Sequence, residues 1–220
     1  MPTHHPTLDL LMDYATGALG EAGALIIATH LALCPNCRRQ VREYEMLGGL
    51  FLDQEDLTPL ADECLQAVMA RLDQETGPPG QASHPGRATG RPAAVLPQPL
   101  RGYLGGDPSD LTWKTVARGM ETVGIEIGAG TARARLMRLR PGTVVPRHTH
   151  DGTELMLVLA GGVADRGVDF RRGDLSISDA SVDHSPAADP REGCICLMVT
   201  DAPLRLTGTI GRLLNPFVRL

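Results

Sequence analysis

A stretch rich in proline and glycine divides the sequence into two parts with different hydrophobic patterns. It runs from Thr76 to Leu100 and reads TGPPGQASHPGRATGRPAAVLPQPL. Large apolar side chains are too sparse in it to bury the surface that would offset the entropy lost on ordering. We therefore predict a flexible, partly extended linker at residues 77–100, a first domain at residues 1–76 and a second at residues 101–220.

The first part has the apolar spacing of short helices. Helix starts are expected at Thr7, near Glu21, at Pro35 and after Thr58-Pro59. The third helix is expected to span about residues 36–47, because two consecutive glycines follow and weaken its end. Cys64 falls in the apolar stripe of the fourth helix and is expected in the core. The first domain is therefore predicted to be a small all-α bundle.

The second part changes to the pattern of short strands. Apolar and charged residues largely alternate from Ala132 to Leu139, and apolar runs follow at Leu155–Leu159 and Cys194–Val199. Turn signals built from Gly, Pro and Asp separate such runs at regular spacing. Many short strands without a long helix indicate an all-β barrel or sandwich. Four arginines are expected on the solvated side of an early strand, namely Arg133, Arg135, Arg138 and Arg140.

The composition is that of a soluble globular protein, with 42% hydrophobic and 21% charged residues. No apolar run approaches the length that spans a bilayer, and the start, MPTHHP, lacks the basic and apolar regions of a signal peptide. We therefore expect a cytoplasmic protein without membrane contact. Because thiols stay reduced there, the five cysteines suggest metal ligands or redox chemistry rather than disulfides.

The charge is distributed unevenly between the two parts. Residues 1–76 contain four arginines and twelve acidic residues, a net charge of −8, which leaves +3 for the rest of a chain whose total is −5. A domain this acidic is repelled by nucleic acid and attracted to a basic surface. An acidic surface kept only for solubility explains the same charge. A zinc module that binds nucleic acid directly is disfavoured.

The segment from His30 to Cys37, HLALCPNC, carries a candidate metal site. His30 and Cys34 are four residues apart, so they share one face at the end of a helix, and the Pro-Asn turn returns Cys37 to them. A tetrahedral zinc site needs one more ligand, which the doublet His4-His5 can supply. A redox-active CxxC is the alternative, but it expects a thioredoxin-like βαβ context that this sequence lacks.

A histidine followed by His-x3-Cys-x2-Cys resembles the zinc-binding anti-sigma domain. In that family a small helical bundle holds zinc and wraps around an extracytoplasmic-function sigma factor, blocking its surfaces for core polymerase and promoter DNA. The resemblance implies that zinc is held by His5, His30, Cys34 and Cys37. His4 remains the rival of His5 for the first position.

A second candidate metal site lies in the segment GTVVPRHTHDGTELMLVLAG, residues 142–161. His148 and His150 are two apart on an expected strand and point to one face, and Glu154 keeps that parity. His184 is the only histidine beyond the segment and is the candidate fourth ligand. Three histidines and one glutamate can hold zinc, iron or manganese. A metal-free barrel with buried histidines is the alternative.

This segment resembles the first cupin motif, G-x5-H-x-H-x3-E-x6-G, at every defined position. The second cupin motif, Pro-x-Gly-x-x-His, is kept only in its histidine, because residues 179–184 read DASVDH. The predicted fold is thus a small zinc-binding helical bundle followed by a cupin barrel of the jelly-roll type. Over nearly the whole chain this combination resembles the ChrR-type anti-sigma factors.

That resemblance implies a regulator rather than an enzyme. Such proteins restrain a sigma factor until singlet oxygen or an organic hydroperoxide appears. It implies that the barrel is the sensor and holds its own zinc through His148, His150, Glu154 and His184, giving two zinc sites in all. Cys194 and Cys196 share one strand face and are either core residues or oxidant targets. A cupin metalloenzyme, dioxygenase-like, with an appended zinc domain is the alternative function.

Overall fold

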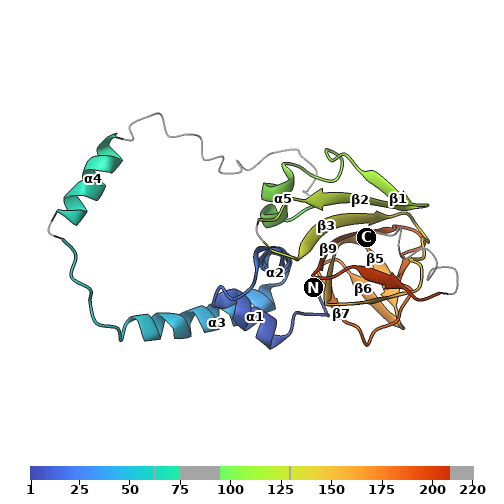
Figure 1. Cartoon of the computed structure of the whole chain (residues 1–220), viewed down its shortest axis with the longest axis horizontal. Coiled ribbons are helices and arrows are strands. Elements are labelled where there is room, and N and C mark those ends of the chain that lie inside the picture. The colour runs from blue at the N-terminus through green and yellow to red at the C-terminus, as the bar shows by residue number, and fades with distance from the viewer. Residues whose placement is uncertain (62, 75–94, 129, 209–220) are drawn as a thin grey trace. The chain divides into compact units, whose positions relative to one another are not determined.

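The chain folds into two compact units of unequal size. The computed structural model describes residues 1–61, 63–74, 95–128 and 130–208 (Figure 1). One unit joins residues 1–48 with the described residues from Val95 onward, and the other comprises the described residues between Gly49 and Ala94. Residues 77–94 of the predicted linker lie outside the described residues. Leu96 and Leu100, near the end of that segment, are buried in the larger unit.

Five helices form where the apolar spacing changes to three and four residues. They are α1 (Leu8–Ala15), α2 (Glu21–Leu33), α3 (Pro35–Leu52), α4 (Cys64–Gln74) and α5 (Gln98–Leu104). The Thr7 hydroxyl accepts the Leu10 N–H at 3.3 Å, which confirms the predicted cap of α1. No helix in the described part of the chain is long and apolar enough to cross a membrane.

Three sequence-based expectations for the later helices are wrong. α3 continues through Gly48 and Gly49 to Leu52, because glycine lowers helix stability without removing any backbone hydrogen bond. α4 begins at Cys64, several residues after Pro59, and the Cys64 side chain is exposed rather than in a core. The apolar stripe of α4 is not buried within its own unit.

All strand pairings in the described part are antiparallel. The strands are β1 (Lys114–Ala117), β2 (Met120–Ile125), β3 (Arg133–Leu139), β4 (His148–His150), β5 (Glu154–Asp165), β6 (Val168–Arg171), β7 (Leu175–Ser178), β8 (Ala187–Ala188), β9 (Cys194–Thr200) and β10 (Leu204–Leu206). The large sheet runs in the order β1-β2-β3-β9-β5-β6, with β7 and β8 also paired to β5, while β4 pairs with β10. Pairing of β5 with four strands makes it the centre of the cupin fold.

β5 changes its partners by bending at Gly161. Its first half pairs with β7 and its second half with β6 and β8, and the register against β9 shifts between Val158 and Ala160. Gly161 has φ +66°, and a Cβ there would collide with the carbonyl oxygen of Gly193. Glycine is therefore required at this bend.

Alternate residues of the central strands feed two separate apolar cores. Leu155, Leu157 and Leu159 of β5 belong to the core shared with the helices, whereas Met156 and Val158 belong to the core inside the cupin fold. β9 alternates in the same way. Continuous apolar runs occur in strands that are covered on both faces, which explains why these two segments do not alternate in sequence.

The helices of the larger unit cover the outer face of the sheet. α2 packs against α1, α5, β5 and β9 (Figure 1). Its Ile26 and Ile27 are fully buried although they are consecutive, because α2 is covered on several sides. The helical segment and the barrel therefore share a core, and this contact brings the two candidate metal sites into one compact unit.

The predicted row of solvated arginines is only half correct. Arg133 and Arg140 are exposed, but Arg135 and Arg138 are partly buried. Arg138 forms an ion pair with Glu121 at 2.7 Å and lies over the ring of Trp113. Arg135 donates to the hydroxyl of Thr200 at 3.3 Å, so it belongs to the packed part of the sheet.

Candidate metal sites

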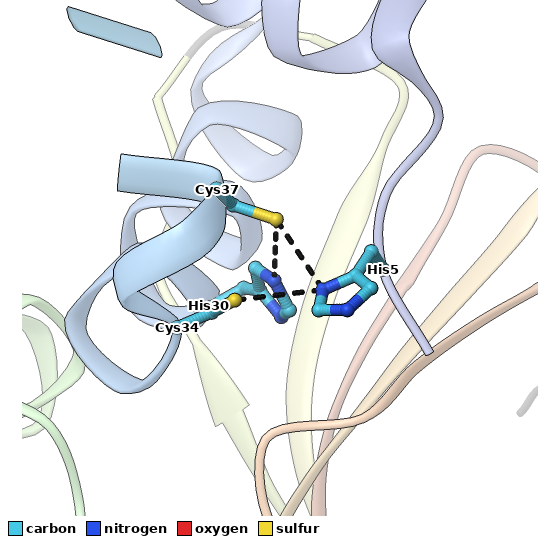
Figure 2. A group of neighbouring side chains, drawn as sticks. All are labelled: His5, His30, Cys34 and Cys37. Carbon is cyan, nitrogen blue, oxygen red and sulfur yellow. Dashed lines mark hydrogen bonds between the residues drawn. The ribbon is translucent and has the colours of Figure 1, made fainter. Parts of the chain in front are cut away.

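The structure brings His5, His30, Cys34 and Cys37 together (Figure 2). One donor atom from each residue lies within 4.8 Å of the donors of the other three. His5 precedes α1, and His30 lies in the last turn of α2. Cys34 follows α2, and Cys37 lies in the first turn of α3. The junction between α2 and α3 thus supplies three donors, and the extended N-terminal segment supplies the fourth.

Short contacts connect all four donors of this first cluster. The Nδ1 atom of His5 lies 3.5 Å from the Cys34 Sγ and 3.4 Å from the Cys37 Sγ, and the Nε2 atom of His30 lies 3.3 Å from the Cys37 Sγ (Figure 2). Two sulfurs and two imidazole nitrogens converging in this way match a four-coordinate zinc site. The cysteines and His30 are buried, while His5 is exposed.

A backbone carbonyl of the barrel orients His30. The Nδ1 atom lies 2.8 Å from the carbonyl oxygen of Gly173, so Nδ1 carries the proton and donates it. The lone pair of Nε2 is then free to face the two thiols. A metal-binding histidine commonly has its second nitrogen held in this manner, which fixes both tautomer and ring orientation.

Burial disfavours the charged forms of two members of the first cluster, His30 and Cys37. Burial lowers the pKa of His30 to about 4, with the nearby His5 adding to the effect. Burial also raises the pKa of Cys37 to about 12, followed by the influence of Cys34. A bound cation acts in the opposite sense on the cysteines, since metal coordination favours the thiolate.

His4 lies outside this cluster. Its Nδ1 atom lies 3.6 Å from a carboxylate oxygen of Asp174, and its ring centroid lies 4.7 Å from that of Phe170. The structure therefore places His5, and not its neighbour, next to the cysteines. Adjacent residues in an extended segment point to opposite sides, so only one histidine of the doublet can face the cysteines.

His148, His150, Glu154 and His184 form a second cluster inside the cupin fold. Their donor atoms again lie within 4.8 Å of one another, and all four residues are buried. β4 carries His148 and His150, and β5 begins with Glu154. His184 lies in the loop between β7 and β8 and bridges back to His148 through reciprocal backbone hydrogen bonds of 2.9 and 3.0 Å.

Two of these histidines are held by groups outside the cluster. His184 Nδ1 lies 2.7 Å from the Asp165 carboxylate, and His148 Nδ1 lies 2.7 Å from the carbonyl oxygen of Pro146. Each Nδ1 therefore carries the proton, and each Nε2 is left with a lone pair. The His184 Nε2 lies 3.0 Å from the His150 Nε2. Two ring nitrogens this close require a proton or a cation between them.

Glu154 supplies an independent sign that a cation fits here. Its Oε2 atom is buried and has no hydrogen-bond partner among the described residues. Burial raises the pKa of Glu154 to about 7, despite the opposing charge of Arg135. Burial also lowers the pKa of His150 to about 4. A divalent cation coordinated by these residues would satisfy the carboxylate oxygen and the free nitrogen lone pairs together.

A cavity of about 480 Å³ opens onto the second cluster. Three cluster residues, His148, Glu154 and His184, lie in its wall. Most of the remaining wall is apolar and contains four methionines together with Cys196. Cys194 and Cys196 are both buried in the same inner core. The sequence-based expectation that these cysteines lie near the metal pocket is met for Cys196.

Sequence reasoning missed Asp165 and Asp174, the two buried carboxylates beside the clusters. Asp165 ends β5 and holds His184, while Asp174 follows β6 and contacts the N-terminal segment. Asp174 lies in an Arg-Gly-Asp turn signal, so only its role as a turn residue was readable. No local signal separates a buried carboxylate from an exposed one, since the difference depends on distant segments.

The comparisons with known proteins agree with this two-part architecture. A family model of ChrR cupin-like domains matches residues 103–204, and a family model described as "Putative zinc-finger" matches residues 6–38. The anti-sigma-E factor ChrR of Cereibacter sphaeroides is 38% identical over 217 residues, which cover 99% of this chain and 98% of that protein.

A solved structure extends this match to three dimensions. The crystal structure of Rhodobacter sphaeroides SigE in complex with the anti-sigma ChrR aligns with a TM-score of 0.78 at 35% identity. The alignment covers 91% of this chain and 100% of the matched chain. The match extends over nearly the whole length of both chains. The chain therefore belongs to the ChrR family of anti-sigma factors.

Proposed function

We propose that this chain is a cytoplasmic, zinc-containing anti-sigma factor. Residues 1–76 sequester an extracytoplasmic-function sigma factor, and the cupin domain at residues 101–220 triggers its release on an oxidative signal, either singlet oxygen or an organic hydroperoxide. The observation that carries the proposal is the near full-length match to a chain whose solved structure is a complex with SigE. The geometry of the two clusters supports the zinc content.

Exposed apolar surface on two helices supports a protein partner. α4 exposes large apolar residues at the three- and four-residue steps of one helix face. These residues are Leu65, Val68, Met69 and Leu72. The last turns of α3 expose another set, Met46, Leu47, Leu50, Phe51 and Leu52. Apolar surface of this extent costs free energy in water and marks a site that a partner covers.

The charge of this segment fits the same partner. Residues 1–76 carry a net charge of −8, and a sigma factor presents basic surfaces to DNA. Opposite charges raise the association rate, while the exposed apolar side chains of α3 and α4 supply most of the affinity when the partner buries them. Because direct binding of the acidic segment to nucleic acid would be repulsive, the regulator acts through the sigma factor and not on DNA.

Zinc in the first cluster would fasten the N-terminal segment to the α2–α3 junction. His5 is separated from His30 by a whole helix and a loop, so a bound ion would close the chain between them. Closed four-ligand sites of this donor type contribute folding free energy directly. Loss of the ion would then loosen the helices that hold the sigma factor.

The sulfur-lined cavity supports the barrel as the place where an oxidant is sensed. Met137, Met198 and Cys196 line it beside the second cluster, and thioethers and thiols are the side chains that peroxides oxidise. A hydrogen bond with Cys194, together with burial, raises the pKa of Cys196. This cysteine therefore stays a protonated thiol, which is less reactive than a thiolate. Methionine needs no deprotonation to react.

The same cavity favours a cupin metalloenzyme instead. A volume of about 480 Å³ is sufficient for a small substrate. If the ion is zinc, four protein donors complete a tetrahedral site, whereas catalytic zinc sites keep an open position. Iron in the second cluster together with oxygen uptake in the presence of a small molecule would favour the enzyme. Zinc without turnover would favour the regulator.

The decisive experiment captures partners with the full-length chain as bait, using lysate from the source organism and mass spectrometry. We expect a sigma factor, and we expect its loss in the Cys34→Ser/Cys37→Ser double variant. Asp169→Ala is the control, because Asp169 is exposed on β6 and lies outside both clusters and outside α3 and α4. A folded, zinc-loaded bait that captures no sigma factor would contradict the proposal.

A second arm tests the signal. The purified complex is exposed to cumene hydroperoxide, or to light with a singlet-oxygen sensitiser, and the free sigma factor is measured. Release from the intact complex and not from a complex carrying His184→Ala is the expected result. Equal release from both complexes would place the sensor outside the second cluster.

A further inference from the structure

The turn between β6 and β7, Arg171–Leu175, contacts the first metal cluster at two places. These are the N-terminal segment that carries His5 and the side chain of His30 on α2. Asp174, the fourth residue of this turn, is only 2% exposed. Its Oδ1 atom accepts the backbone N–H groups of Thr3 at 2.6 Å and His4 at 3.0 Å, and its Oδ2 atom accepts the N–H of Arg171 at 2.8 Å. A buried carboxylate therefore holds the two residues that precede His5.

A backbone pairing strengthens the same attachment. The Leu175 N–H donates to the carbonyl oxygen of His4 at 3.1 Å, so the N-terminal segment lies along the start of β7. Burial by itself raises the pKa of Asp174, but the N–H groups of Arg171, His4 and Thr3 outweigh it and the pKa is lowered. The carboxylate is ionised at neutral pH, which makes each of these hydrogen bonds charge-assisted.

The turn also contacts His30, the cluster member on α2. The Gly173 carbonyl oxygen accepts the proton of His30 Nδ1 at 2.8 Å, so one turn orients two of the four donors. Gly173 has φ +90°, and a Cβ there would come within 2.6 Å of the Cγ atom of Pro2. Only glycine adopts this conformation and allows the N-terminal segment to pack so closely.

The opposite side of the turn is bound to β5. The Val158 N–H donates to the Asp174 carbonyl oxygen at 3.0 Å, and the Gly173 N–H donates to the Val158 carbonyl oxygen at 2.8 Å. β5 also carries Glu154 of the second cluster and Asp165, which holds His184. The turn is thus a packed and hydrogen-bonded link between the strand that builds the second cluster and the donors of the first.

We propose that Asp174 and Gly173 are positioning residues for the first metal cluster, so that its hold on the metal depends on the conformation of the cupin turn. This inference rests on the proposed regulator for its biological meaning, because it gives the barrel a direct influence on the helices that bind the partner. A displacement of β5 or of the turn would shift His5 and His30 relative to the two cysteines and weaken the first site.

The test uses the full-length protein loaded with Co²⁺ at both clusters. Only the first cluster contains thiolates, so the near-ultraviolet thiolate-to-cobalt band follows that site alone. Increasing chelator is added while this band and the visible cobalt bands are recorded. We expect Asp174→Ala to lose cobalt from the first cluster at a chelator concentration at least about tenfold lower than the unchanged protein requires. This factor is in the range found for groups that orient metal ligands.

Two further variants exclude a general loss of charge or of fold. Asp174→Asn keeps one carbonyl acceptor and is expected to give an intermediate value, which a purely electrostatic role would not produce. Asp169→Ala removes an exposed carboxylate on β6 and is expected to match the unchanged protein. The unfolding midpoint of each variant is measured in parallel.

Three outcomes would overturn the inference. They are unchanged chelator sensitivity of the first cluster in Asp174→Ala, equal loss of cobalt from both clusters, and an equal effect of Asp169→Ala. No sigma factor is present in this assay. A failure here leaves the proposed partner untouched, and a failure to capture a sigma factor leaves this result standing.

Discussion

The two metal clusters of this chain differ in the chemistry of their donors and in where those donors come from. The first joins two cysteines and two histidines at the end of a helix and in an extended segment, and one of its members is exposed. The second joins three histidines and a glutamate on strands and a loop, and all its members are buried. The first contains two sulfur donors, whereas the second contains none and borders a cavity lined by Met137, Met198 and Cys196.

The surroundings of the clusters differ as well. The second cluster is held within the barrel by Asp165 and the carbonyl of Pro146, which both belong to the cupin fold. The first is held across a boundary, because the cupin turn orients donors that belong to the helical segment. A site supported only by the sheet can stay intact while a site supported by both the helices and the sheet responds to movement between them.

The largest expected effect tests the first cluster directly. Replacing both Cys34 and Cys37 by serine should lower the bound zinc from two ions to one and unfasten the N-terminal segment. Zinc sites of this type contribute on the order of 10 kcal/mol to the folding of small domains. Metal analysis and amide hydrogen exchange of α1 and α2 are the measurements. Two retained ions would show that the cysteines are not ligands.

The next effect compares the two cores that β5 separates. Leu157 is fully buried on the helix side, and Val158 is fully buried on the barrel side. Leu157→Ala should lower the free energy of unfolding by about 2–5 kcal/mol, because it leaves a cavity where α2 meets the sheet. Val158→Ala removes less volume and should cost less. A larger cost for Val158→Ala in urea unfolding would reverse the relative importance of the two cores.

A pH effect separates the second cluster from the first in metal-free protein. The pKa of Glu154 is raised to about 7, so its contribution to stability is present below the unfolded pKa and is lost as the pH rises through 7. His30 and His150, with pKa values lowered to about 4, act in the opposite direction. Their contribution to stability is present above pH 6.5 and is lost as the pH falls toward 4.

Glu154→Gln removes only the first of these contributions. From pH 5 to pH 7 the metal-free variant should therefore gain about 2 kcal/mol more stability than the unchanged protein. Urea unfolding at several pH values measures the difference. Identical pH profiles for the two proteins would mean that burial does not raise the pKa of Glu154.

The smallest effect concerns the cap beside the first cluster. Thr7→Ala removes the hydroxyl that accepts the Leu10 N–H at the start of α1, and it should cost about 1 kcal/mol. Because His5 lies two residues earlier, chelator sensitivity should rise slightly at the first cluster and not at the second. Thr16→Ala at the other end of α1 is a control for the hydroxyl alone. Equal effects on the two clusters would contradict a local role.

Much of the fold follows from local patterns. The cap at Thr7, the start of α3 at Pro35 and the strands at residues 155–159 and 194–199 all lie where the sequence indicates them. These features depend on nearest neighbours along the chain, such as hydroxyl capping and hydrophobic runs between turns. The end of α3 and the start of α4 were misjudged, because glycine and proline shift helix ends without fixing them.

The ligand sets depended on spacing in a similar way. His30, Cys34 and Cys37 are close in sequence, and so are His148, His150 and Glu154, so each group is placed by one local element. His5 and His184 are the distant members. The family pattern indicates His5, and His184 is the only histidine after residues 142–161. The structure brings both of them next to the local donors.

The sequence by itself determined most of the helical and strand segments, the local parts of both clusters and the division of charge, but it did not indicate α5, which begins inside the predicted linker. Only the tertiary structure decided that α2 shares a core with the sheet, that His5 faces the cysteines and His4 faces Asp174, and that the cupin turn orients His30. The physical reason is range. Capping and periodicity act over a few residues, whereas burial and the pairing of Asp174 with Thr3 join segments 171 residues apart.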